Sequence, residues 1–525
     1  MPCPEVPNFD GRETRMKSSM MAGTAAVALL VATSAPAAAG SPACASRNNN
    51  TDKKLLECVT LDGVRTHQAA FQEHADENDG NRFAGLPGSD ASIDYVAGLL
   101  RNAGYAVTVQ EFEYLASIEL GASALEQVAP TPTVYLQGTD FDLFSNTEGG
   151  DVTGAVTPVD LQLGLGNTST SGCEALDFAG FPAGNIALLQ RGTCSFQIKA
   201  ENADAAGAAG AIIFNQGNTP DRTGLINGTL GEYTGNIPVA EATYALGEEW
   251  AGTPSLELRL FANALREPLT TANVLAETRG GRADNIVMVG AHLDSVAEGP
   301  GINDNGSGSA AILETALQMK NVNPRNKVRF AWWSAEESGL LGAEYYVANL
   351  SNIELANIAL YLNFDMVGSP NYVRFIYDGN GDTFGLEGPE GSASIEEYFA
   401  NFYTARGLQF EPTAFDGRSD YGPFIDSGVA SGGLFTGAEE IKTAEQEEIY
   451  GGTAGDAFDP CYHQACDDLD NFNAEVLDLN SDAIASVTLQ YAMNTQAVNG
   501  IKGKGNFKKA KPLKNPERRG SKFLR

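Results

Sequence analysis

Histidine is scarce in this sequence. The 525 residues include only four, and only His292 and His463 lie beyond the first hundred positions. Positive charge is also in deficit, and the formal net charge is −33. This charge argues against nucleic acid or anionic membranes as partners. The cysteines form no Cys-x-x-Cys pair, which disfavours the alternative of a thiolate zinc site. The apolar run Ala22–Ala32 is too short to provide a stable membrane span.

The N-terminus has the pattern of an export signal. A basic start at Arg15–Lys17 precedes the apolar run, and small residues up to Ala39 provide a cleavage site. We therefore expect a signal peptide over the first 40 residues, with translation starting at Met16 or Met20. The mature protein is predicted to be secreted or periplasmic.

Export makes disulfides admissible in this chain. Seven cysteines are present, and Cys3 precedes or lies within the signal. The other six allow fifteen pairings. Proximity along the chain favours Cys44 with Cys58, Cys173 with Cys194, and Cys461 with Cys466.

The pattern up to residue 130 predicts two helices and a strand. Apolar positions recur at helical spacing over Leu55–Asp79 and Ser89–Asn102. Ala106–Tyr114 alternates like a strand, but its phase shifts by one residue at Gln110–Glu111, which predicts a β-bulge. We assign residues 41–130 to the first part of the main domain.

Two segments differ in amino-acid composition from the main domain. Residues 131–264 are rich in Gly and Thr, have short apolar runs and contain no histidine. They are predicted to form an inserted β-rich module, a lid or binding domain without metal chemistry. Residues 501–525 carry ten Lys or Arg and one acid. This basic tail is predicted to be disordered, with an envelope-binding or secretion role as the alternative.

Residues 265–500 alternate between strand and helix patterns. Such alternation predicts an α/β fold, with a mostly parallel sheet flanked by helices. The predicted strands are Thr271–Glu277, Ile286–Ala291, Lys327–Ser334 and Ile358–Asp365, and the predicted helices are Ser309–Met319, Leu340–Asn349, Ser394–Ala405 and Ala474–Thr495.

Acidic residues and a histidine follow successive strands of this domain. The carboxyl ends of parallel strands share one sheet edge, where open α/β sheets place their chemistry. Each residue has a structural alternative, such as a buried histidine or an acid at a helix N-terminus. Their recurrence at successive strand ends favours a common site. The residues are His292, Asp294, Asp304, Glu336, Glu337, Asp365 and, in a loop, His463.

Five of these side chains fit a pair of divalent cations. Such a pair needs about one bridging carboxylate and two terminal ligands per ion. Asp304 is predicted to be the bridge, Glu336 remains free as a base, and Asp294 is placed to orient His292. Imidazole and carboxylate without thiolate suit zinc. The predicted ligands of two Zn²⁺ ions are His292, Asp304, Glu337, Asp365 and His463.

Six motifs carry a resemblance to a known family. They are G-A-H-L-D-S, G-I-N-D-N-G-S-G, W-S-A-E-E-S-G-L-L-G-A, N-F-D-M-V-G, D-G-R-S-D-Y-G-P-F and D-P-C-Y-H-Q-A-C-D. From about Leu55 to Val498 the chain resembles the secreted co-catalytic zinc aminopeptidases of metallopeptidase clan MH, the leucyl aminopeptidase and aminopeptidase Y group. The resemblance implies a phosphorylase/hydrolase-like zinc exopeptidase fold.

The resemblance also implies roles for individual residues. It pairs His292 and Asp365 on one zinc, and Glu337 and His463 on the other, with Asp304 between them. It makes Glu336 the general base, places Tyr462 beside the substrate carbonyl oxygen, and implies a Cys461–Cys466 disulfide. The insertion resembles a protease-associated (PA) domain through R-G-T-C-S-F, Lys199 and A-A-G-A-A-G-A-I-I-F-N.

These observations predict an exported di-zinc aminopeptidase that acts on peptides with a free N-terminus. Phe424, Ile425, Leu434 and Phe435 favour a hydrophobic pocket, and hence Leu-like substrates. A carboxypeptidase or dipeptidase on the same scaffold is the nearest alternative. A non-catalytic binding protein is an alternative from another class.

Overall fold

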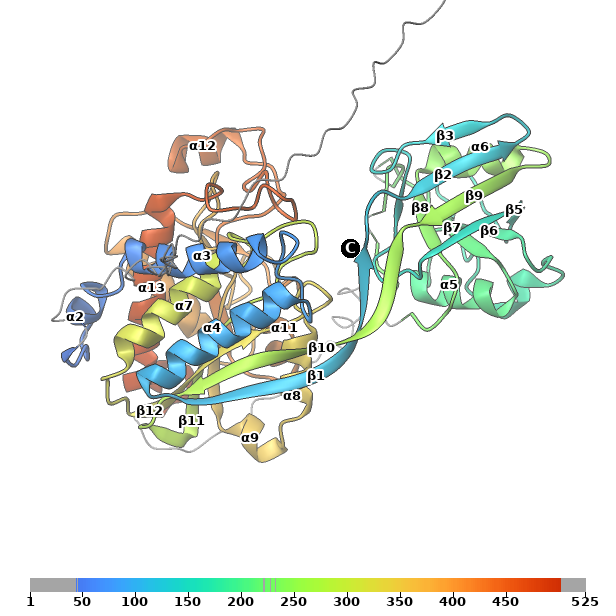
Figure 1. Cartoon of the computed structure of the whole chain (residues 1–525). Coiled ribbons are helices and arrows are strands. Elements are labelled where there is room, and N and C mark those ends of the chain that lie inside the picture. The colour runs from blue at the N-terminus through green and yellow to red at the C-terminus, as the bar shows by residue number, and fades with distance from the viewer. Residues whose placement is uncertain (1–43, 45, 221, 227, 232, 502–525) are drawn as a thin grey trace, which may run out of the picture. The chain divides into compact units, whose positions relative to one another are not determined.

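The computed structural model describes residues 44 and 46–501, except 221, 227 and 232. The predicted signal peptide and almost all of the basic tail lie outside these residues. Two eight-stranded sheets organise the described chain, one in the main domain and one in the inserted segment (Figure 1).

The main-domain sheet has the order β1-β10-β12-β11-β13-β16-β14-β15. Its centre is parallel, because β11 pairs in parallel with β12 and β13, and β13 with β16. The α/β prediction is therefore confirmed. The strands are β1 (Ala106–Glu119), β10 (Ala264–Glu277), β11 (Arg282–His292), β12 (Asn326–Trp333), β13 (Ile358–Phe364), β14 (Phe375–Tyr377), β15 (Glu411–Thr413) and β16 (Ser431–Phe435).

Helices cover both faces of this sheet. One core cluster joins the strands to α3, α4, α7, α10 and α13, and another joins the opposite face to α8 and α11 (Figure 1). The helices are α2 (Asp52–Leu56), α3 (Leu61–Asp76), α4 (Pro87–Ala103), α7 (Gly306–Met319), α8 (Leu341–Ala348), α9 (Asn352–Ala356), α10 (Ser392–Thr404), α11 (Tyr421–Asp426), α12 (Ala444–Tyr450), α13 (Ala474–Met493) and α14 (Gln496–Asn499). None of the helices in the described residues has the length and apolar character needed to cross a bilayer.

The predicted bulge in β1 is wrong. The pairing of β1 with β10 runs in unbroken antiparallel register from Ala106–Glu277 to Glu119–Ala264. Val107 and Val109 pack towards the main core, whereas Phe112 and Tyr114 belong to a second cluster. The hydrophobic phase shifts because opposite faces of one regular strand are covered at its two ends.

The inserted segment forms the second sheet, in the order β3-β2-β9-β5-β6-β7-β8-β4. It begins at Ala124, upstream of the boundary at 131 expected from composition. Its elements are β2 (Ala124–Ala129), β3 (Thr133–Tyr135), β4 (Phe141–Leu143), β5 (Gly150–Pro158), η1 (Ala175–Phe178), β6 (Ile186–Gln190), α5 (Phe196–Ala205), β7 (Gly210–Phe214), β8 (Val239–Ala242), α6 (Tyr244–Gly252) and β9 (Glu257–Ala262).

Three disulfides staple the chain. They join Cys44 to Cys58, Cys173 to Cys194, and Cys461 to Cys466. The third closes a small loop that carries Tyr462 and His463, so it restricts the backbone next to the predicted site.

Candidate metal centre

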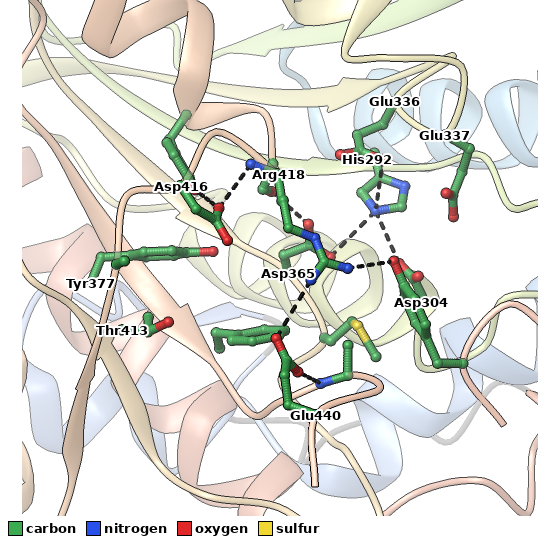
Figure 2. A pocket seen from close by; sticks show the side chains of 17 residues that line it. His292, Asp304, Glu336, Glu337, Asp365, Tyr377, Thr413, Asp416, Arg418 and Glu440 are labelled. Atoms are coloured by element: carbon green, nitrogen blue, oxygen red, sulfur yellow. Dashed lines mark hydrogen bonds and ion pairs between the residues drawn. The ribbon is translucent and has the colours of Figure 1, made fainter. Parts of the chain in front are cut away.

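The central strands deliver the predicted ligands to one sheet edge. β11 ends at His292, a loop and turn after β12 present Glu336 and Glu337, and β13 is followed directly by Asp365. These strands form because their runs of buried apolar residues can pack against helices on both faces. Figure 2 shows the side chains converging on one pocket.

Asp304 lies between the two histidines. One of its carboxylate oxygens is 3.2 Å from His292 Nε2, and the other is 3.4 Å from His463 Nε2. His292 Nε2 also lies 3.3 Å from Asp365 Oδ1 (Figure 2). His463 Nε2 lies 3.1 Å from Glu337 Oε2. Two triplets of side chains that could hold a metal ion therefore share Asp304, and a third such group consists of His292, Glu336 and Glu337.

The donor atoms fit a bound cation. Glu337 Oε1 is buried and has no hydrogen-bond partner among the described residues, while Asp365 Oδ1 and His463 Nε2 make ion-pair contacts but no hydrogen bond there. Leaving buried polar atoms unpaired costs free energy, and a divalent cation with oxygen and nitrogen ligands would satisfy them. Glu336 stands further back, with its carboxylate 4.0 Å from His292 Nε2.

The crowded carboxylates change the protonation of the site. Burial lowers the pKa of His292 and His463, but the surrounding acids outweigh it and raise both well above the usual value. Burial raises the pKa of Glu336 well above its usual value, and Glu337 adds to this effect. Without cations the site therefore holds protons where a metal would otherwise balance the charge.

Asp294 holds the turn that carries the two glutamates. Its carboxylate accepts hydrogen bonds from the backbone N–H of Glu336 at 3.2 Å and of Glu337 at 3.3 Å. His292 Nδ1 is nearer to the backbone carbonyl of Asp294, at 3.2 Å, than to its carboxylate, at 3.8 Å. Burial raises the pKa of Asp294 to about 7.

The backbone at the site adopts unusual conformations. Ala335 before Glu336, Met366 after Asp365, and His463 itself have positive φ values of 56°, 44° and 56°. Such conformations are uncommon for residues other than glycine. They redirect the chain as it leaves β12 and β13, and turn the side chains towards the pocket.

A chain of hydrogen bonds runs from Trp333 to the carboxylate of Asp365 and restrains it. Trp333 Nε1 donates to Tyr361 Oη at 2.8 Å, and Tyr361 donates to Asn363 at 2.9 Å. Asn363 donates to Ser419 Oγ at 2.8 Å, and Ser419 donates to Asp365 at 2.5 Å. The motif D-G-R-S-D was noted in the sequence, but this role of its serine was not found there.

Arg82 was missed from the sequence, and Asp467 was quoted only as the last residue of D-P-C-Y-H-Q-A-C-D, with no role of its own. Arg82 is fully buried and donates to the backbone carbonyls of Leu293, Pro300 and Gly301. Asp467 accepts from the backbone N–H of Asp304 at 2.9 Å. The sequence carries no signal for the role of Arg82, because its burial is seen only in the structure.

The fold and the site define a class: metal-dependent hydrolases with a central α/β sheet and ligands at its carboxyl edge. Residues 273–488 match the model of peptidase family M28, and residues 152–250 match that of the PA domain. An aminopeptidase of Pseudomonas aeruginosa is 56% identical over 450 residues, which cover 86% of this chain and 84% of that protein. Leucine aminopeptidase 2 of Arthroderma otae is 44% identical over 383 residues, covering 71% and 76%.

A solved structure agrees with these relatives. The zinc aminopeptidase of Bacillus subtilis is 26% identical, with a TM-score of 0.57, and the match covers 82% of this chain and 94% of that one. The chain belongs to peptidase family M28. It is a zinc aminopeptidase that carries a PA domain, and it acts on peptides.

Proposed function

We propose that this aminopeptidase binds two zinc ions. His292 and Asp365 would hold one ion, Glu337 and His463 the other, and Asp304 would bridge them. The observation that supports this most is the position of Asp304, with one oxygen facing each imidazole. Metal analysis of the purified enzyme should give about two zinc ions per chain, and a content of one would contradict the proposal.

The residues around the ions would carry out the proton transfers. Bound zinc supplies a Lewis acid that polarises the scissile carbonyl and eases deprotonation of water. Glu336 accepts a proton from the attacking water and returns it to the leaving amine. Tyr462 donates a hydrogen bond to the carbonyl oxygen as negative charge develops there. The substrate ammonium lies near the carboxylates of Glu336 and Asp365.

Contact with a free ammonium distinguishes an aminopeptidase from the carboxypeptidase alternative. We expect leucyl anilide to be hydrolysed, whereas its N-acetylated form should be turned over at least about 10³-fold more slowly, because it lacks the charge that the carboxylates recognise. Chelator should abolish both activities. Equal rates for the two anilides would contradict the proposed orientation of the substrate.

We propose a preference for Leu-like N-terminal residues. Of the four apolar residues expected at the pocket, Phe435 lines it, whereas Phe424, Ile425 and Leu434 are buried in the core. Met366 also lines the pocket, as does Tyr377 (Figure 2). Phe435→Ala should lower kcat/KM for leucyl anilide about tenfold, and for alanyl anilide much less, since only the larger side chain loses contacts.

Zinc binding should weaken at low pH. The pKa values of His292 and His463 are raised in the metal-free site, so below those values zinc must displace protons. The apparent zinc affinity should fall about tenfold per pH unit for each proton displaced. Calorimetric titration of the metal-free enzyme in buffers of different ionisation enthalpy measures the released protons. A pH-independent affinity would contradict this expectation.

We also propose that the enzyme is exported and that residues 124–262 form the inserted PA domain, acting as a lid or binding domain. The N-terminal sequence pattern and the three disulfides support export. N-terminal sequencing of the protein secreted by its host should start near residue 40. Retention of the first residues would contradict cleavage.

A further inference from the structure

Arg418 lies in the loop between β15 and α11, next to the proposed metal ligands. Its backbone N–H donates to Asp416 Oδ1 at 2.9 Å, and Tyr421 Oη donates to the same oxygen at 2.7 Å. The next residue, Ser419, donates to Asp365 at 2.5 Å. The backbone of Arg418 is therefore held in a fixed relation to the site.

The guanidinium of Arg418 reaches from this loop into the pocket (Figure 2). Nη2 lies 2.9 Å from Glu439 Oε1, and Nη1 lies 3.5 Å from Glu440 Oε1. Nη2 also donates a hydrogen bond of 3.3 Å to Tyr462 Oη. The two glutamates and the tyrosine together restrain the guanidinium.

The direction of the bond between Arg418 and Tyr462 has a chemical consequence. A guanidinium has donors only and stays charged, so the phenol oxygen must be the acceptor. The single proton of the hydroxyl then points in another direction. Accepting a bond from a cation also makes the hydroxyl a stronger donor.

The ring of Tyr462 is constrained as well. It stacks on the imidazole of His463 with centroids 3.8 Å apart and planes 24° apart. The stacking restrains the plane of the ring, whereas the direction of the hydroxyl proton depends on the hydrogen bonds that the phenol oxygen makes. The contact with Arg418 is such a bond.

We propose that Arg418 is a positioning residue for peptide hydrolysis: it orients the Tyr462 hydroxyl so that its proton points at the oxygen of the scissile carbonyl. The inference rests on the role proposed above for Tyr462. Arg418 acts through the tyrosine and makes no bond to the reacting atoms. Its effect should therefore fall on kcat rather than on substrate binding, because the carbonyl oxygen gains charge only in the transition state.

A double-mutant cycle tests this coupling. Arg418→Gln should lower kcat for leucyl anilide about tenfold to hundredfold, with KM changed less than about threefold. In a Tyr462→Phe background the same substitution should have no further effect, since the hydroxyl is gone. Arg418→Lys, which keeps a cationic donor, should recover much of the loss. Zinc content and Tm should match wild type. Arg101→Gln, the same substitution at an exposed arginine that does not line the pocket, serves as the matched control with kcat within about twofold.

The outcomes distinguish the role proposed for Tyr462 from the positioning role proposed for Arg418. If Tyr462→Phe keeps wild-type kcat, the role of Tyr462 fails, and the inference about Arg418 fails with it. If Tyr462→Phe is impaired but Arg418→Gln still lowers kcat fully in that background, only the inference about Arg418 is overturned. It is overturned equally if Arg418→Gln raises KM for dipeptides but leaves anilides unaffected, which would make Arg418 a binder of the substrate carboxylate. If Arg418→Gln lowers Tm, Arg418→Lys takes its place in the double-mutant cycle with Tyr462→Phe. The same outcomes then support or overturn the inference about Arg418.

Discussion

Glu336→Gln is expected to lower kcat by about 10³-fold or more while the zinc content stays unchanged. The side chain is 7% exposed and lies in the pocket, yet its carboxylate is 4.0 Å from the nearest imidazole nitrogen, further than those of Asp304 and Asp365. We therefore propose that Glu336 exchanges protons with water, while the nearer carboxylates of Asp304 and Asp365 hold the ion. Glutamine has the same shape but cannot accept the proton.

The neighbouring glutamate provides a matched control for this substitution. Glu337 has an oxygen 3.1 Å from His463 Nε2, so Glu337→Gln should lose zinc as well as activity. The two substitutions are at adjacent positions, and each removes one negative charge. If Glu336→Gln hydrolysed leucyl anilide at the wild-type rate, or lost its zinc, the role of Glu336 as general base would be wrong.

Asp304→Asn should weaken metal binding at both positions. An amide can direct its oxygen to only one imidazole, whereas the carboxylate faces both, at 3.2 Å and 3.4 Å. We expect the zinc content to fall to one ion per chain or fewer, with a loss of kcat of about 10³-fold or more. Metal analysis after dialysis and leucyl anilide kinetics measure the two effects.

Two further variants sharpen the test of Asp304. His463→Ala should remove the ion on its own side and leave the other largely bound. Asp416→Asn changes an exposed carboxylate that lines the same pocket but belongs to neither triplet, so its zinc content should equal that of wild type. Full zinc occupancy in Asp304→Asn would contradict a bridging carboxylate.

Much of the peptidase fold can be predicted from local sequence. The runs that precede His292 and Asp365 are continuously apolar, and such runs form strands buried on both faces. The observed β11, β12 and β13 end within a few residues of the predicted positions. The shift of hydrophobic phase in β1 misled the prediction, because alternation reports which face is buried and not whether the backbone is regular.

The residues that support the site could not be predicted in the same way. Arg82 holds the loop at Gly301 from a distance of 219 positions, and Ser419 contacts Asp365 across 54 positions. No local periodicity records such contacts. The same limit applies to the pocket, where Phe435 lines the wall, whereas the equally apolar Phe424 is buried against Trp333.

The sequence by itself determined which chemical groups this enzyme can use: two imidazoles and a set of carboxylates at the ends of apolar strands, with no thiolate set to compete for zinc. The tertiary structure alone decided how these groups combine. Asp304 faces both histidines, Glu336 stands back from them, and Arg418 reaches Tyr462. The physical reason is that strand formation depends on neighbouring residues, whereas distances of a few ångströms between side chains far apart in the chain depend on how the whole sheet packs.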